Sequence, residues 1–199
     1  MKRLILLLFL VSYISVEAMG QVYIGLRDNQ YVNMGYILKE KWDFRLEHSV
    51  FNDSFENQYI RGYIGYNDSI GNVEYGVMPF YGMTYNDSFY NMGVYVGAKY
   101  RPLSWLGVKA GVSPFYDSFF RYKTTYLMGL DFNVWPNLYI LGGVSNFPEY
   151  RQSQHRAYVG LSVSYKNLKV SPRITIPLES SSAKRNLRVL VSFTFVFRR

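Results

Sequence analysis

Near its C-terminus the chain reads Asn186-Leu187-Arg188-Val189-Leu190-Val191-Ser192-Phe193-Thr194-Phe195-Val196-Phe197, followed by two arginines. Side chains of an extended strand point alternately to opposite faces, so every second residue shares a face. One face of this stretch is entirely apolar and carries Leu187, Val189, Val191, Phe193, Phe195 and Phe197. The other face is mixed, with Arg188, Ser192 and Thr194 beside Leu190 and Val196. The pattern predicts a β-strand with one apolar face.

This stretch resembles the closing strand of a bacterial outer-membrane β-barrel. In that class the last strand alternates apolar residues and ends on an aromatic, here Phe197, which the insertion machinery is thought to recognise. Arg198 and Arg199 depart from chains that stop at the aromatic. The resemblance implies an all-β fold, a transmembrane antiparallel up-and-down β-barrel of a Gram-negative-type bacterium. It also implies two kinds of partner, outer-membrane lipid with lipopolysaccharide and the barrel-insertion machinery.

The composition of the 199 residues suits one folded domain. Aromatic residues are 19% of the chain, which is too many for a disordered polypeptide. There is no cysteine, and therefore no disulfide framework or thiolate metal site. Beyond the N-terminus no apolar run approaches the roughly 20 residues that a membrane helix needs. These features argue against a helical membrane protein and favour a β-rich domain.

The N-terminal segment, residues 1–20, is predicted to be a cleaved signal peptide. Lys2 and Arg3 give a positive start, residues 4–16 are mostly apolar, and Ala18-Met19-Gly20 supplies small residues for cleavage. A membrane anchor is the alternative, but the apolar core is too short to span comfortably. We therefore expect a mature β-barrel domain of residues 21–199, exported to the cell outer membrane.

The charge of the chain is positive, +8 formally and +7 once residues 1–20 are removed. A basic chain can bind nucleic acid. For an exported, tyrosine-rich chain, anionic lipid or a small anionic solute is the better partner, and we expect no nucleic acid. A basic solvated surface without a specific partner is the plain alternative.

After Gln21 the sequence alternates strands and turns to its end, which predicts about twelve strands. If weak neighbours merge, the count becomes ten or eight. Connections at 39–41, 67–72, 102–105, 135–137 and 166–167 are short, whereas those at 52–57, 84–89, 116–122, 147–155 and 178–185 are on average longer. Short periplasmic turns and longer outward loops are typical of outer-membrane barrels. Only the tight hairpin at 28–30 breaks the alternation.

Aromatic residues gather beside these connections, as expected for the two interfaces of a membrane barrel. One predicted group, at the short turns, is Trp42, Trp105, Trp135, Tyr165 and Phe197. The other, at the longer loops, is Tyr81, Tyr90, Phe115, Tyr122 and Tyr150. A secreted β-sandwich would show the same strand alternation. The signal peptide, the loop lengths and the tryptophans favour the membrane barrel.

If the apolar faces meet lipid, the opposite faces line the interior. Strand parity places there the bases Arg27, Arg45, Arg61, Lys99, Lys109, Arg156, Lys169, Arg173 and Arg188, and the acids Asp43, Glu47, Glu74 and Asp131. Charges inside must be paired or hydrated. One interpretation is a plugged interior of ion pairs, with Tyr63, Tyr95 and Tyr158 packed on the recurring inward glycines. The other is a narrow aqueous path that prefers anions.

Candidate catalytic groups are few, and we expect no enzyme, no cofactor and no metal site. His48 and Ser49 are adjacent on a strand, so they point to opposite faces. His155 follows Ser153 in a loop that also contains Glu149, which leaves a lipid-modifying hydrolase or acyltransferase as the least favoured reading. Asp-Ser-Phe occurs at 53–55, 87–89 and 117–119. Turn chemistry explains these repeats, and a ligand-binding aromatic rim is the alternative.

The sequence therefore predicts an outer-membrane β-barrel, with two leading hypotheses for its role. The first is a narrow, porin-like channel for small anionic solutes. The second is a non-conducting structural or surface-interaction barrel that presents its outward loops. Ion conductance separates the two hypotheses.

Overall fold

The fold is a closed antiparallel barrel of twelve strands, seen in a computed structural model that describes residues 20–49, 58–86, 88–119, 121–146, 155–178 and 187–197. The first six strands are β1 (Gly20–Arg27), β2 (Tyr31–Leu38), β3 (Trp42–Ser49), β4 (Tyr59–Ile70), β5 (Val73–Thr84) and β6 (Tyr90–Leu103). The last six are β7 (Leu106–Asp117), β8 (Arg121–Trp135), β9 (Leu138–Ser145), β10 (Arg156–Tyr165), β11 (Leu168–Pro177) and β12 (Arg188–Phe197). The prediction of a twelve-stranded barrel is confirmed, and the alternatives of eight or ten strands are wrong.

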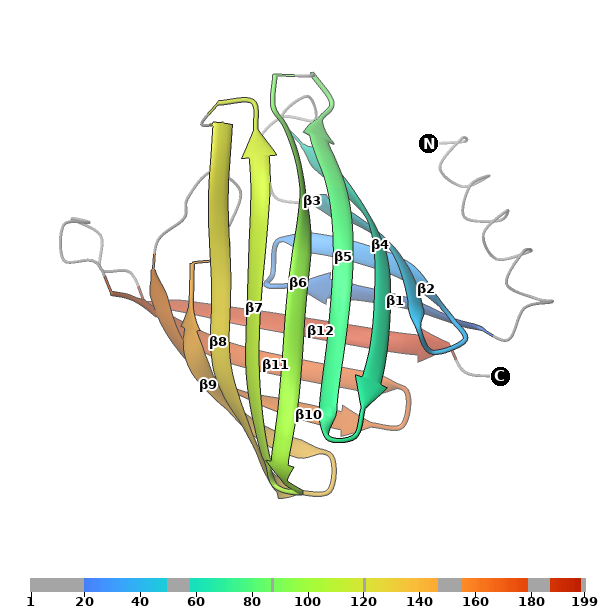
Figure 1. Ribbon diagram of the computed structural model, residues 1–199, viewed down its shortest axis with the longest axis vertical. Coiled ribbons are helices and arrows are strands. Elements are labelled where there is room, and N and C mark those ends of the chain that lie inside the picture. Colours follow the sequence, from blue (N-terminus) through green and yellow to red (C-terminus); the bar gives the residue numbers. More distant parts are fainter. Residues whose placement is uncertain are drawn as a thin grey trace.

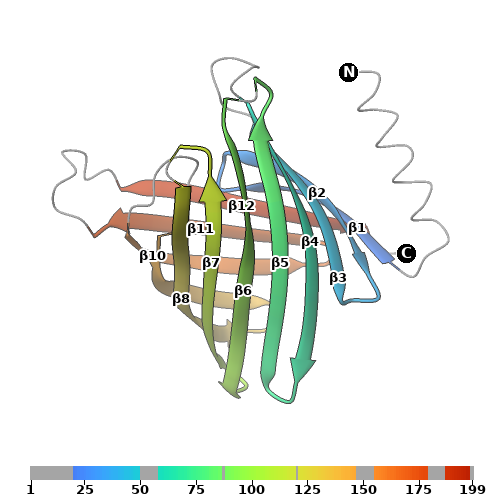
Figure 2. The same ribbon diagram turned by 45° about the horizontal axis from the view of Figure 1, so that its top comes forward.

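Each strand pairs with its neighbours in sequence, and β1 closes the barrel against β12. Figure 1 shows β4–β8 in front and β10–β12 crossing behind them at a steep angle, which reflects the tilt that closure requires. Figure 2 shows the same two walls after a turn of the view. Closure leaves no strand edge unpaired, a condition that lipid imposes on any sheet within it.

The outer face of the barrel is apolar and exposed. Large exposed side chains on this face include Ile64, Met128, Val159, Val189 and Phe193. The interior has the opposite character, because more of the buried side chains are polar or charged than apolar. A water-soluble sandwich would bury its apolar face instead. This inverted distribution suits a surface in contact with hydrocarbon. No helix among the described residues is long and apolar enough to cross a membrane.

The connections define two ends of the barrel. We call the end with the connections 39–41, 71–72, 104–105, 136–137 and 166–167 the short-turn end, and the opposite end the long-loop end. Three predicted connections are shorter than expected. Strand β4 runs on to Ile70, β6 runs on to Leu103, and β8 begins at Arg121. Polar residues such as Asn67 and Asp68 remain in register with β5, so their turn-forming character does not end the strand.

The closure between β1 and β12 is short, because the register joins only residues Val22–Leu26 to Phe193–Phe197. The hairpin 28–30 extends it. The Asn29 N–H donates to the Val191 carbonyl at 3.1 Å. The Val191 N–H donates back to Asn29 Oδ1 at 3.2 Å, and Asn29 Nδ2 donates to the Val189 carbonyl at 3.3 Å. This tight turn therefore bonds to the first residues of β12. That pairing explains why the hairpin 28–30 is short although it lies at the long-loop end.

Candidate functional site in the barrel interior

The face that points inward is identified by contacts that reach over an intervening strand. Tyr23 on β1 donates its hydroxyl to Asp43 Oδ1 on β3 at 2.7 Å, across β2. Lys99 on β6 donates to Asp131 Oδ2 on β8 at 2.5 Å, across β7. The strand register puts all of the sequence-predicted lumen residues on this same face. Their role in lining a solute path stays a prediction.

One interior network is centred on Glu47, whose side chain is almost fully buried. Its Oε2 accepts from Arg27 Nη2 at 2.9 Å and from the Tyr63 hydroxyl at 2.8 Å. Arg61 continues the network, because its Nη1 donates to the Tyr63 hydroxyl at 2.9 Å and its Nε to the Tyr59 hydroxyl at 2.5 Å. Burial of these charges is tolerated because each is hydrogen-bonded to a partner.

A second group lies nearer the short-turn end of β1 and β3. The Asp43 carboxylate accepts from the Tyr23 hydroxyl and, at 2.6 Å, from Arg45 Nη2. Arg45 Nε also donates to the Tyr23 hydroxyl at 2.8 Å. Each of the three side chains contacts both others, which fixes the guanidinium of Arg45 in the interior.

A third group was missed by the sequence analysis, which treated Asp28 only as a turn residue. The Asp28 side chain is buried and accepts from Arg173 Nη2 and from the Ser192 hydroxyl. Both Asp28 and Asn29 have positive φ, at 58° and 59°, a conformation that Asp and Asn adopt more readily than most residues. This backbone geometry turns the Asp28 carboxylate inward, a result that strand alternation alone does not reveal.

The part of the barrel wall that includes β6, β7, β8 and β11 carries a lysine cluster around one carboxylate. Asp131 accepts from Lys99 Nζ at 2.5 Å and from Lys109 Nζ at 2.8 Å. Lys169, on β11, interacts electrostatically with both lysines and with Asp131. Three cations therefore share a single anion. Bases exceed acids on this wall, which leaves the local charge positive.

The remaining predicted residues lie closer to the ends of the barrel. Glu74 pairs with Arg101 at 2.9 Å, and both side chains are exposed at the short-turn end. At the long-loop end, Arg156 Nη1 donates to Thr175 Oγ1 at 3.2 Å, and Arg188 lies opposite Thr175 in the strand register. The short-turn end also has an ion pair outside the lumen. There Lys41 donates to Asp68 Oδ2 at 2.8 Å, and this hydrogen bond raises the pKa of the Lys41 ammonium.

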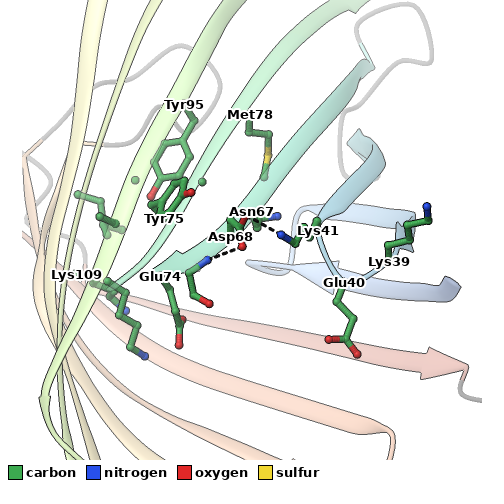
Figure 3. Close-up of a pocket in the computed structure, with 16 residues that line it drawn as sticks. Lys39, Glu40, Lys41, Asn67, Asp68, Glu74, Tyr75, Met78, Tyr95 and Lys109 are labelled. Atoms are coloured by element: carbon green, nitrogen blue, oxygen red, sulfur yellow. Dashed lines mark hydrogen bonds and ion pairs between the residues drawn. The ribbon is translucent and has the colours of Figure 1, made fainter. Parts of the chain in front are cut away.

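Two of the cavities in the described part of the chain follow each other along the interior. The larger, of about 680 Å³, is at the short-turn end and is lined by the turn 39–41 together with Met78, Tyr95, Lys99 and Lys109 (Figure 3). The smaller, of about 170 Å³, is lined by Arg27, Arg45, Arg61, Glu47, Tyr63, Met78, Phe80, Tyr95 and Ser113. Met78 and Tyr95 line both cavities, so the two cavities adjoin at these side chains.

Tyrosine fills much of the remaining interior by packing on glycine. A Cβ at Gly111 would lie 2.3 Å from the Tyr95 hydroxyl, and one at Gly97 would lie 2.5 Å from it. A Cβ at Gly129 would lie 2.3 Å from the hydroxyl of Tyr158. Here the glycines accommodate aromatic rings against bare backbone, as the plugged interpretation expects. The interior thus contains both filled regions and charged cavities.

The aromatic residues beside the turns lie at the barrel ends. Trp42, Trp105, Trp135, Tyr165 and Phe197 are all exposed at the short-turn end of their strands. At the long-loop end Tyr81, Tyr90 and Tyr122 are exposed, but Phe115 is buried on the inward face, and a Cβ at its register partner Gly93 would clash with it. The assignment of Phe115 to the outer girdle is therefore wrong. Tyr150 lies outside the described residues.

Of the candidate catalytic residues, only His48, Ser49 and His155 lie within the described ranges. His48 and Ser49 lie on opposite faces of β3, with Ser49 buried. His155 Nδ1 is 2.8 Å from the Tyr126 hydroxyl, whereas Ser153 and Glu149 lie outside the described residues. Within the described ranges there is no group of three or more His, Asp or Glu side chains that could hold a metal ion.

The Asp-Ser-Phe repeats show turn chemistry where they are described. The Phe119 N–H donates to Asp117 Oδ1 at 2.9 Å, and the Ser88 N–H donates to Asn86 Oδ1 at 3.1 Å. Side chains that bond the backbone two residues on are typical of Asp and Asn in turns. The copy at 53–55 and Asp87 lie outside the described residues.

A closed antiparallel barrel with an apolar outer face and a charged interior has the architecture of an outer-membrane β-barrel protein. Comparison with solved structures agrees. The chain is similar to the KdgM porin, solved in complex with disordered oligogalacturonate, with a TM-score of 0.62 and 14% sequence identity over 90% of this chain and 99% of that one. A mutant Rh. blastica porin gives a TM-score of 0.43 and 12% identity over 88% and 55%. No protein-family model and no curated protein matches the chain.

Proposed function

We propose that this chain is an outer-membrane, porin-like barrel that passes small anionic solutes. The observation that carries the proposal is the excess of cations along the interior cavities. The smaller cavity, which we call the inner cavity, is lined by Arg27, Arg45 and Arg61 but by only one acid, Glu47. The larger cavity, at the short-turn end, is lined by four bases, Lys39, Lys41, Lys99 and Lys109, and by three acids, Glu40, Asp68 and Glu74. Rings of basic side chains in a pore favour anions.

Two further features support an anion in the inner cavity. The Nε of Arg27 is buried and has no hydrogen-bond partner among the described residues, so one donor beside the cavity is left unsatisfied. The barrel is also similar in fold to the KdgM porin, whose structure holds oligogalacturonate, a chain of acidic sugars. The low sequence identity carries only the fold, so the solute class rests on the cavity charges.

The test is single-channel current of the refolded protein in KCl, before and after addition of galacturonate. We expect galacturonate to reduce the chloride current, because it competes for the same cations. Galactose is the matched control, since it has the same ring without the carboxylate, and it should leave the current unchanged. An equal effect of both sugars, or silence from protein shown to be folded, would contradict the proposal.

A non-conducting barrel that presents its loops is the second candidate function. The packing of Tyr95 and Tyr158 on glycine favours it, because filled volume narrows any path. Under this alternative the ion pairs around Glu47 and Asp131 are structural only. The current measurement separates the two candidates, because a plugged barrel carries no current in KCl, whether or not either sugar is added.

A further inference from the structure

An aromatic layer lies at the long-loop end of the interior, beside β2, β4 and β6. Tyr31 from β2, Tyr59 from β4 and Phe89, which immediately precedes β6, face inward and form a buried cluster. Their exposed fractions are 6%, 1% and 4%, so the layer is tightly packed. The ring centroids of Tyr59 and Phe89 are 6.0 Å apart. Because Arg61 donates to the Tyr59 hydroxyl, this layer lies directly against the charged inner cavity.

A second aromatic ring covers the first. Phe119, in the connection between β7 and β8, stacks on Phe89 with centroids 5.5 Å apart and an interplanar angle of 29°. Phe119 is 52% exposed, so it is the outermost ring of the stack. Both phenylalanines end copies of the Asp-Ser-Phe repeat, on neighbouring connections. The repeat thus places two rings in one stack at the same end of the barrel.

The two rings are held differently. Phe89 is anchored to Thr84, which is fully buried: the Phe89 N–H donates to Thr84 Oγ1 at 3.1 Å, and the Thr84 N–H donates to the Phe89 carbonyl at 2.9 Å. Phe119 lies on an exposed turn that Ser118 joins to the start of β6. The Ser118 N–H donates to the Tyr90 carbonyl at 2.9 Å, and the Tyr90 N–H donates to Ser118 Oγ at 3.2 Å.

We propose that Phe89 and Phe119 form a hydrophobic gate, in which Phe89 is the fixed layer and Phe119 the movable cover. The inference rests on the proposed channel function and adds its regulation. Apolar constrictions in a pore exclude water and so block ions without any charged barrier. The Ser118–Tyr90 hydrogen bonds hold the cover shut, and their rupture lets Phe119 leave the stack. Solute then passes between the long-loop end and the arginine-lined cavity.

The experiment measures the open fraction of single channels for wild type, Phe119→Ala, Phe89→Ala and the double variant. We expect a severalfold increase for Phe119→Ala and a further increase for the double variant, because each substitution removes one ring. Phe132→Ala is the matched control. Phe132 faces outward and stacks on Trp105 at 6.3 Å, so its removal should leave the open fraction unchanged.

A reversible lock tests the movement of the cover. The chain has no cysteine, so the pair Tyr90→Cys and Ser118→Cys introduces the only two thiols. Their backbones are hydrogen-bonded neighbours, within the range that a disulfide bridges. We expect oxidation to suppress opening of this variant and a thiol reductant to restore it. Each single cysteine variant should be insensitive to the redox treatment.

The outcomes distinguish the gate from the channel. Conducting wild type with unchanged phenylalanine variants and no effect of the lock overturns the gate and leaves the proposed channel intact. Raised opening without anion preference supports the gate and overturns the proposed solute class. Silence of wild type and all variants, with folding verified, overturns both.

Discussion

Glu47 is the residue on which the interior charges depend. Its carboxylate is almost completely buried and accepts from Arg27 and Tyr63, with Arg61 one hydrogen bond away. Glu47→Gln keeps the shape but removes the buried carboxylate that accepts from Arg27, which then keeps only its longer ion pair with Asp28, at 3.7 Å. Removing one partner of a buried ion pair costs about 3 kcal/mol. We expect a loss of that size in the free energy of unfolding, measured by tryptophan fluorescence in lipid vesicles during urea titration.

Glu74→Gln is the matched control for that substitution. Glu74 pairs with Arg101 in the same way, but both side chains are exposed at the short-turn end. Exposed ion pairs contribute less than about 1 kcal/mol, so the control should unfold close to wild type. Equal losses for the two variants would show that burial does not set the contribution of the Glu47 network.

Charge at single positions also sets the expected selectivity. Glu47→Gln removes the one acid that lines the inner cavity, whereas the pair Lys99→Gln and Lys109→Gln removes two bases from the larger one. The reversal potential in a KCl gradient should therefore shift toward chloride for the first variant and away from chloride for the second. Identical potentials for wild type and both variants would mean that current avoids these side chains.

Strand alternation predicts a shared face for the charged residues of regular strands, and the role of those residues in lining a solute path stays a prediction. It could not predict Asp28, because a residue in the left-handed backbone region leaves the two-residue period. It also could not predict the position of Phe89, which depends on hydrogen bonds to Thr84 from across a turn. Phe115 shares the parity of Lys109, but its place beside a loop suggested the girdle instead.

At the scale of elements, the hairpin 28–30 stabilises the closure between β1 and β12. Asn29 makes two side-chain hydrogen bonds to the end of β12, and its φ is positive. Asn29→Gly keeps the backbone conformation available but removes those bonds. We expect a loss of about 1 kcal/mol in unfolding free energy, the usual net value of such hydrogen bonds.

Asn137→Gly is the control for the hairpin. Asn137 also has positive φ, at 68°, and follows Pro136 in a two-residue turn of the type that places Asn at such a position. Its carbonyl accepts from the Ser164 N–H, a bond that glycine keeps. Unfolding of this variant should match wild type. A larger loss at Asn137 than at Asn29 would contradict the stabilising role of the first hairpin.

The strands themselves were predicted well because alternation persists along their length, but their ends were not. Polar residues at 67–69 indicate a turn by composition, yet β4 pairs with β5 through them as far as Ile70 and Val73. Beyond the bilayer a strand can carry polar residues on both faces, so composition no longer distinguishes strand from turn there. Backbone pairing, which sequence does not display, decides where such strands end.

At the scale of the whole molecule, the barrel is divided into regions along its length. A cavity with lysines opens at the short-turn end, a smaller cavity with arginines follows, and stacked aromatic rings lie at the long-loop end. Met78 and Tyr95 line both cavities. Bases outnumber acids by three to one at the smaller cavity and by four to three at the larger one. This arrangement assigns selectivity to the cavities and control of passage to the rings.

The reversal potential of the wild-type protein in a KCl gradient tests the central claim most directly. The folded protein is inserted into a planar bilayer of neutral lipid, so that lipid charge does not contribute to ion selectivity. An anion-preferring interior predicts unit current steps whose reversal potential lies toward the chloride equilibrium potential. A reversal potential at zero or toward potassium, or the absence of steps from protein shown to be folded, would contradict it.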